Sequence, residues 1–244
     1  MTSSSATLAA NTQARDAAKP VFGWLFAAAI VAVIGAYVRA IAFTPIEALQ
    51  GAVQKIYYLH VPAWMACYLA YGLVALGSVI NLWLQDERAD RLAASAAEVG
   101  ILFNTVGLTV GPLWAKPIWG TWWTWDARLT STLFLWFIFA AYLVLRGAIE
   151  SPSQRARFSA VLAVLGVLLI PFIHLSVYLF RTLHPMPIML QPQALVNPPL
   201  SPEMETTFLI SSLAFVLLCV ALVVARYRVA TLIALADDAE GIGE

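Results

Sequence analysis

Six apolar stretches, each long enough to cross a lipid bilayer, constrain this chain more than any other feature of its sequence. A membrane core needs about 20 apolar residues per helix. Runs of this kind occupy residues 21–43, 58–84, 96–114, 129–146, 158–180 and 206–226. Their continuous apolar character favours helices over the alternating strands of an outer-membrane barrel. The sequence therefore predicts an all-α, polytopic membrane protein with six transmembrane helices.

The composition excludes several classes of function. Charged residues make up 11% of the chain, against about 25% in soluble domains. Fourteen basic and fourteen acidic residues give a net charge of zero, so no basic field is available to attract nucleic acid. The two cysteines, Cys67 and Cys219, lie in apolar stretches without CxxC spacing, which argues against a thiol-redox centre, a zinc site and covalent haem attachment.

The distribution of Lys and Arg predicts the orientation. With a cytoplasmic N-terminus, nine of these residues fall on the cytoplasmic side and five on the other, as the positive-inside rule requires. Both termini are then cytoplasmic, and the connections 44–57, 115–128 and 181–205 face the opposite side. We expect one membrane domain at 21–228, a polar arm at 1–20 and a partly disordered acidic tail at 229–244.

Tryptophan is concentrated in one of these outward connections, between the third and fourth helices. Interfacial belts place one or two tryptophans at a helix end, and five in one connection exceed that pattern. Large indole faces could instead form a flat platform for a planar aromatic ligand, and we favour this interpretation. The five residues are Trp114, Trp119, Trp122, Trp123 and Trp125.

Two of the three histidines are predicted on the same side of the membrane as the tryptophans. His60 opens the second helix and His184 follows the fifth. Singly, each is more typical of an interfacial hydrogen-bonding residue, but two neutral imidazoles beside the platform could ligate haem iron from opposite faces. His174 lies deeper, beside Pro171, where we expect it to hydrogen-bond a carbonyl freed by a proline kink. We leave His174 out of the site.

Charged residues near this proposed site have two interpretations each. Lys55, Arg128 and Arg181 could pair with the two haem propionates or simply extend to the interface from helix ends. Asp126 could N-cap the fourth helix or pair with Arg128. Six prolines between residues 185 and 202 stiffen an outward loop that could cover the site or dock a partner.

Motifs for nucleotide binding and hydrolysis are absent from the sequence. None of the three lysines follows a glycine, so there is no phosphate-binding loop, and ATP hydrolysis would belong to a partner. HExxH and GxSxG motifs are also missing. Asn104, Gly107 and Gly111 are the nearest approach to the polar, broken helices of a secondary transporter, and the signal is weak.

A resemblance to a known family supports the haem interpretation. The string WGTWWTWDARLT at residues 119–130 resembles the tryptophan-rich WWD motif of haem-handling proteins. With six spans and one histidine in each flanking outward connection, the chain resembles the CcmC family of cytochrome c biogenesis from the first span to the sixth.

The resemblance implies a non-enzymatic protein of the bacterial inner membrane that holds haem b at the periplasmic face. Such proteins deliver haem to the chaperone CcmE and work with CcmD and with CcmA and CcmB of an ABC-type complex. The alternatives are a permease subunit of an ABC-type haem exporter, or a scaffold whose tryptophans dock another protein. The resemblance places the axial ligands on His60 and His184 and the motif tryptophans on Trp119, Trp122, Trp123 and Trp125, while Trp114, Lys55 and Arg181 are added from their position.

Overall fold

A computed structural model describes residues 21–186 and 200–241, and within them six helical spans are long and apolar enough to cross a membrane. The prediction of an all-helical, six-span protein is confirmed. The polar arm at 1–20 and residues 187–199 of the proline-rich connection lie outside the described residues. The helices are α2 (Val21–Val38), α3 (Tyr57–Leu84), α4 (Glu87–Trp119), α5 (Ala127–Ala148), α6 (Pro152–Val167), α7 (Leu169–Leu179) and α8 (Pro202–Gly241), with a π-helical turn η1 (Arg39–Phe43) and a 3-10 turn η2 (Ala52–Ile56).

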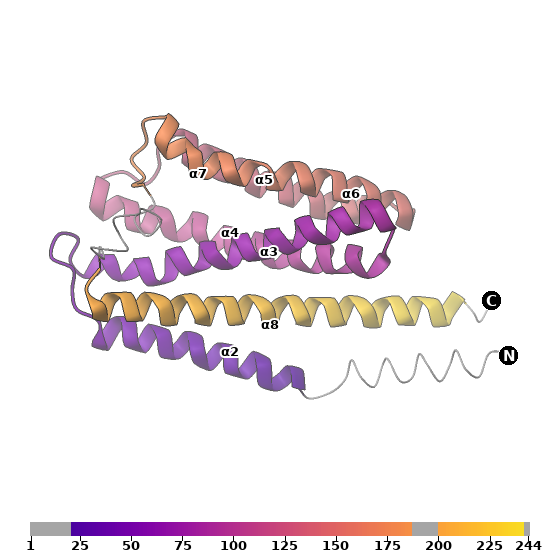
Figure 1. Ribbon diagram of the computed structural model, residues 1–244, viewed down its shortest axis with the longest axis horizontal. Coiled ribbons are helices and arrows are strands. Elements are labelled where there is room, and N and C mark those ends of the chain that lie inside the picture. Colours follow the sequence, from indigo (N-terminus) through magenta and orange to yellow (C-terminus); the bar gives the residue numbers. More distant parts are fainter. Residues whose placement is uncertain (1–20, 187–199, 242–244) are drawn as a thin grey trace.

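Consecutive spans run antiparallel to one another (Figure 1). The central pair is α3 and α4, with α2 and α8 along one side and α5, α6 and α7 along the other. We call the end at which α3 begins and α4 and α7 finish the histidine end. The start of α2 and the finish of α8 lie at the opposite end of the bundle.

Small residues on α4 let the aromatic side chains of α3 pack closely against its backbone. A Cβ atom at Gly100 would lie 2.4 Å from the Tyr71 ring, and one at Gly107 would lie 2.4 Å from the indole of Trp64. Buried Asn104 donates to the hydroxyl of Tyr71 at 3.2 Å. These residues of α4 therefore contribute to helix packing. Packing explains Asn104 and Gly107, which the sequence offers as part of a weak transporter signal.

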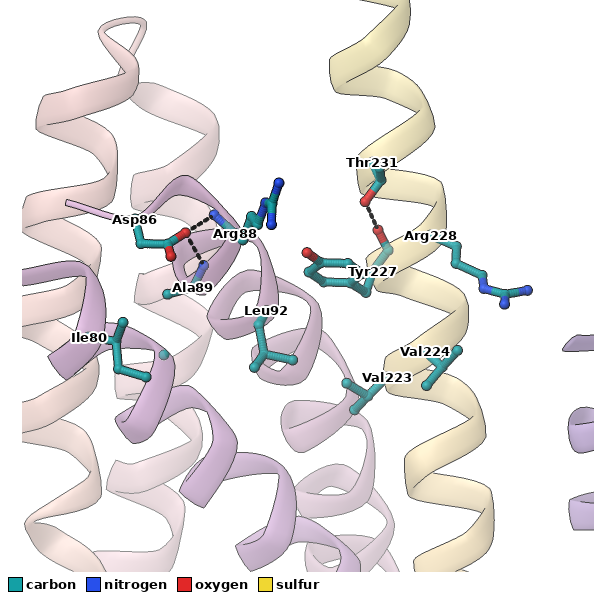
Figure 2. A pocket seen from close by; sticks show the side chains of 11 residues that line it. Ile80, Asp86, Arg88, Ala89, Leu92, Val223, Val224, Tyr227, Arg228 and Thr231 are labelled. Carbon is teal, nitrogen blue, oxygen red and sulfur yellow. Dashed lines mark hydrogen bonds between the residues drawn. The ribbon is translucent and has the colours of Figure 1, made fainter. Parts of the chain in front are cut away.

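The helices extend beyond the apolar stretches because polar residues cap them. Asp86 accepts hydrogen bonds from the backbone N–H groups of Arg88 and Ala89 (Figure 2), which begins α4 nine residues before the predicted span at 96. At the other end, Gly120 adopts a φ of 74° and its N–H bonds to the carbonyl of Lys116. Only glycine adopts this conformation at low cost, so α4 continues to Trp119 and not to residue 114.

The prediction of a partly disordered tail from residue 229 is wrong for residues 229–241. Helix α8 continues without a break to Gly241. The sequence ATLIALADDAE at 230–240 is rich in Ala and Leu, which are strong helix formers, so the helix outlasts the apolar run. Residues 242–244 lie outside the described residues.

The fifth span consists of two helices, α6 and α7, which meet at Leu168. Pro171, in the first turn of α7, lacks the N–H that would bond to the carbonyl four residues earlier. The imidazole of His174 bonds through Nδ1 to the carbonyl of Ile170 at 3.1 Å. The expected imidazole–carbonyl bond is present, but the acceptor is not the carbonyl that Pro171 frees.

Candidate functional site

The histidine end brings together side chains from α3, from the α4–α5 connection and from the segment after α7. His60 is the fourth residue of α3, and His184 lies five residues beyond the end of α7. The side chain of His60 lies within range of electrostatic interaction with His184 and Arg128. The two histidines that the sequence predicts on one side of the membrane therefore lie at the same end of the bundle.

His60 is held in a close-packed niche. Its side chain is 8% exposed, and the indole of Trp114 meets the imidazole edge to face, with ring centroids 5.8 Å apart and an interplanar angle of 72°. Gly111 of α4 provides the space, because a Cβ atom there would lie 3.2 Å from His60 Cε1. The position of the imidazole is thus fixed by α4.

A hydrogen bond defines the tautomer of His60. The indole N–H of Trp64, one turn along α3, donates to His60 Nε2 at 3.2 Å. A nitrogen that accepts this bond carries no proton, so the proton of the neutral ring is on Nδ1. That Nδ1 is buried and has no hydrogen-bond partner among the described residues.

His184 is held by its own backbone segment. Its N–H donates to Thr182 Oγ1 at 2.8 Å, and Nδ1 bonds to the carbonyl of Pro185 at 3.0 Å. Because a carbonyl only accepts, Nδ1 carries the proton and Nε2 keeps its lone pair. Burial and the nearby positive charge of Arg128 lower the pKa of His184 to about 4, so the ring is neutral near pH 7.

The five tryptophans do not form one flat surface. Trp114 lies within α4 and packs against His60 and Tyr57, and its indole N–H donates to Gln50 Oε1 at 3.0 Å. Trp123 and Trp125 meet edge to face at 76°, and together with Leu108 and Leu133 they line a shallow hollow of about 310 Å³. The remaining pair, Trp119 and Trp122, is exposed at the end of α4 and just after it.

Asp126 is the N-cap of α5. Its Oδ1 accepts from the N–H of Leu129 at 2.9 Å, and its Oδ2 accepts from Thr124 Oγ1 at 3.0 Å. The first of the two structural roles predicted for Asp126 is therefore confirmed. These bonds also fix the end of the tryptophan segment just before Arg128.

Of the three predicted cations, Arg128 is the one that the structure places beside the histidines. The guanidinium of Arg128 is half-buried, and its Nη1 has no hydrogen-bond partner among the described residues. Lys55 instead donates from Nζ to the carbonyl of Ile41 at 2.6 Å and ties η2 to the π-helical turn. Arg181 is exposed.

The contribution of Trp64 and Gly111 could not be predicted from the sequence. Trp64 lies inside an apolar helix, where an indole at helical spacing is typical of a core residue. In the structure it bonds to His60 and stacks on Tyr68 at 5.8 Å, and Tyr68 in turn contacts His174 at 5.0 Å. The signal that could have found it is its position four residues after His60 on the same face of α3.

Several buried hydrogen-bond donors at the histidine end have no partner among the described residues. They include His60 Nδ1, Arg128 Nη1, the indole nitrogen of Trp123 and the hydroxyls of Tyr58 and Thr130. Buried donors are normally paired, and unpaired ones at one site suggest that a bound molecule supplies the acceptors. The described residues contain no group of three or more His, Cys, Asp and Glu side chains that could hold a metal ion.

Comparisons with known proteins point to one family. The family model described as Heme exporter protein C matches residues 4–239. Proteins named Heme exporter protein C are similar to this chain in Bradyrhizobium diazoefficiens (37% identical, covering 85% of this chain and 78% of the relative), Escherichia coli K12 (34%, 84% and 81%) and Haemophilus influenzae (33%, 84% and 82%).

Six helical spans that are long and apolar enough to cross a bilayer define a polytopic membrane protein, and imidazole, indole and guanidinium groups gather at one end of its bundle. The match over nearly the whole chain makes the assignment more specific. The chain belongs to the CcmC family.

Proposed function

We propose that this protein handles haem in cytochrome c biogenesis, holding haem b as cargo between His60 and His184 and delivering it to the chaperone CcmE. The observation that carries the proposal is the pair of neutral imidazoles at one end of the bundle, each with its proton on Nδ1. Both therefore present Nε2, the usual iron-binding nitrogen, as the unprotonated atom. Haem iron would leave two axial positions for them.

The remaining residues would hold the porphyrin. Arg128 would pair with a propionate through the guanidinium nitrogen that has no hydrogen-bond partner among the described residues, and Lys55 and Arg181 would interact with haem only if they turn toward it. The indoles of Trp114, Trp119, Trp122, Trp123 and Trp125 would supply apolar contact. Asp126 would act through the backbone, because its carboxylate holds the start of α5.

We further propose that the histidine end faces the periplasm of a bacterial inner membrane and that both termini are cytoplasmic. The excess of Lys and Arg at the opposite end supports this orientation. The protein would work with the ABC-type subunits CcmA and CcmB and with CcmD, since the chain carries no phosphate-binding loop of its own. Trp125 is 77% exposed beside the site. Haem bound there would therefore be accessible to a membrane-anchored chaperone.

Covalent loading of CcmE tests delivery. Cells that produce CcmE with this protein should accumulate haem-stained CcmE on denaturing gels, and cells without it should not. Equal staining of CcmE in both strains would contradict delivery.

Vesicle uptake separates the proposal from a permease. Under our proposal, inside-out and right-side-out vesicles with this chain and its ATPase subunits take up no more haem than vesicles without the chain. Accumulation of haem inside the lumen would favour the permease alternative.

Haem affinity should depend weakly on pH above pH 5. Only a neutral imidazole ligates iron, so protons compete with haem below the pKa of the ligand. Since the pKa of His184 is lowered to about 4, competition from this residue begins near pH 4 and not near the ordinary value of about 6.5. Equilibrium titrations of the detergent-purified protein from pH 8 to pH 5 should therefore give nearly constant affinity. A loss of about tenfold per pH unit already below pH 6.5 would contradict this.

Trp64→Phe should strengthen haem binding about fivefold. The Trp64 indole occupies His60 Nε2 in the haem-free chain, and iron must replace that hydrogen bond, whose net contribution is about 1 kcal/mol. Phe keeps the ring but cannot donate. The matched control is Trp83→Phe at the exposed opposite end of α3, which should leave affinity unchanged. Weaker binding by Trp64→Phe would show that the indole supports the bound state instead.

A further inference from the structure

A short turn before α3 reaches across to α4 and bonds to a residue of the candidate site. The turn spans residues 47–51 and precedes η2. Its Gln50 accepts a hydrogen bond at Oε1 from the indole N–H of Trp114 at 3.0 Å, and both side chains are half-buried. The two residues are 64 positions apart in the sequence. The bond therefore joins two separate elements of the histidine end.

Local hydrogen bonds fix the backbone at Gln50. Its N–H and that of Leu49 both donate to Oε2 of Glu47. The N–H of Gly51 bonds to the carbonyl of Glu47 at 3.0 Å. Gly51 has a φ of 64° and a ψ of −149°, a conformation that is essentially restricted to glycine. The turn thus holds its shape through its own bonds, independently of Trp114.

Trp114 connects this turn to the imidazole of His60. Its indole meets that ring edge to face at a centroid distance of 5.8 Å, and it also contacts Tyr57, the first residue of α3. Trp123, by contrast, has an indole nitrogen without a hydrogen-bond partner among the described residues. Of these two indoles, Trp114 is the one that a bond from another element holds in place.

The contact between Trp114 and His60 becomes more important once iron is bound. In the haem-free chain the indole of Trp64 also holds the imidazole, because it donates to Nε2. Iron bound to Nε2 would displace that bond. His60 Nδ1 has no hydrogen-bond partner among the described residues, so packing against Trp114 and Gly111 would remain to orient the ring.

We propose that Gln50 is a positioning residue that holds the imidazole of His60 in place for iron through Trp114. The inference rests on the proposed function, because it concerns how the same site keeps its axial ligand. Residues that do not touch a metal can orient the ligands that do, and their loss lowers metal affinity. Gln50 acts on the iron only through Trp114 and His60.

Gln50→Leu tests the proposal, because leucine is similar in size but accepts no hydrogen bond. The full-length, detergent-purified variant should bind haem about fivefold more weakly, the factor that one ordinary hydrogen bond contributes, and part of its haem should be high-spin. Gln50→Glu keeps an acceptor oxygen and should restore the low-spin spectrum. The matched control is Leu49→Ala in the same turn, whose side chain is 93% exposed and which should bind haem as the wild type does.

A double-variant cycle separates positioning from a general loss of packing. Trp114→Phe removes the donor of the same bond, so adding Gln50→Leu to it should cost little further haem affinity. Additive losses, wild-type affinity and spin state in Gln50→Leu, or an equal loss in Leu49→Ala would overturn this inference while the proposed function stands. A wild type that binds no haem would overturn the proposed function and this inference with it.

Discussion

Replacing His60 with Ala should abolish the low-spin haem spectrum of the purified protein and lower haem affinity by more than about tenfold. Loss of a residue that hydrogen-bonds to a metal ligand lowers metal affinity about 10–100-fold. Loss of an axial ligand itself should lower haem affinity at least as much. The side chain is buried against Gly111 and Trp114, and alanine supplies no ligand atom in its place. His184→Ala should have the same spectral effect.

The controls separate ligation from packing. His174→Ala removes a histidine of α7 that bonds to the carbonyl of Ile170, and it should retain haem. His60→Gly opens a space at the imidazole position, and added imidazole should restore the low-spin spectrum if ligation is what the substitution removed. Membrane insertion should be normal in every variant. Low-spin haem spectra in both His60→Ala and His184→Ala would end the ligation hypothesis.

Replacing Arg146 with Leu should destabilise the folded protein by about 3–5 kcal/mol. The Arg146 guanidinium forms two hydrogen bonds to the Asp90 carboxylate, at 2.6 and 2.8 Å, and the two side chains are 15% and 16% exposed. The pair joins α5 to the first turn of α4. Without Arg146 the carboxylate of Asp90 remains buried and unpaired, which is the costly outcome. Unfolding of the detergent-solubilised protein by added SDS measures the loss.

A second ion pair and a double variant provide the comparison. Arg226 and Glu98 join α8 to α4 with similar geometry, but their side chains are 40% and 39% exposed. Arg226→Leu should therefore cost about 1 kcal/mol or less. Asp90→Leu/Arg146→Leu, which removes both charges, should recover most of the stability lost in Arg146→Leu. Equal losses of stability in Arg146→Leu and Arg226→Leu would contradict the view that the contribution of an ion pair to stability depends on its burial.

The sequence predicts the number and order of the spans because a bilayer requires long apolar runs. It also places His60 and His184 at one end, since an even number of crossings, those of the second, third, fourth and fifth spans, lies between them. Helix ends were less predictable, because Asp86 and Gly120 act by local backbone bonds outside the apolar runs. The helical course of residues 229–241 was missed because acidic residues obscured a strong helix-forming composition.

Within the candidate site, the limits of sequence analysis have a common physical cause. With the third span predicted to end at residue 114, all five tryptophans belong to one connection. In the structure α4 continues to Trp119, and Trp114 lies inside this helix against His60. The indole of Trp64 and the gap at Gly111 depend on how α3 and α4 pack. Such contacts arise between helices and leave no pattern along a single one.

The visible absorption spectrum of the detergent-purified protein, made in cells supplied with haem, tests the central claim most directly. Binding between His60 and His184 predicts a Soret band and, on reduction, sharp α and β bands of six-coordinate low-spin haem. A preparation that is colourless as purified and stays colourless during haem titration would contradict haem handling at this site.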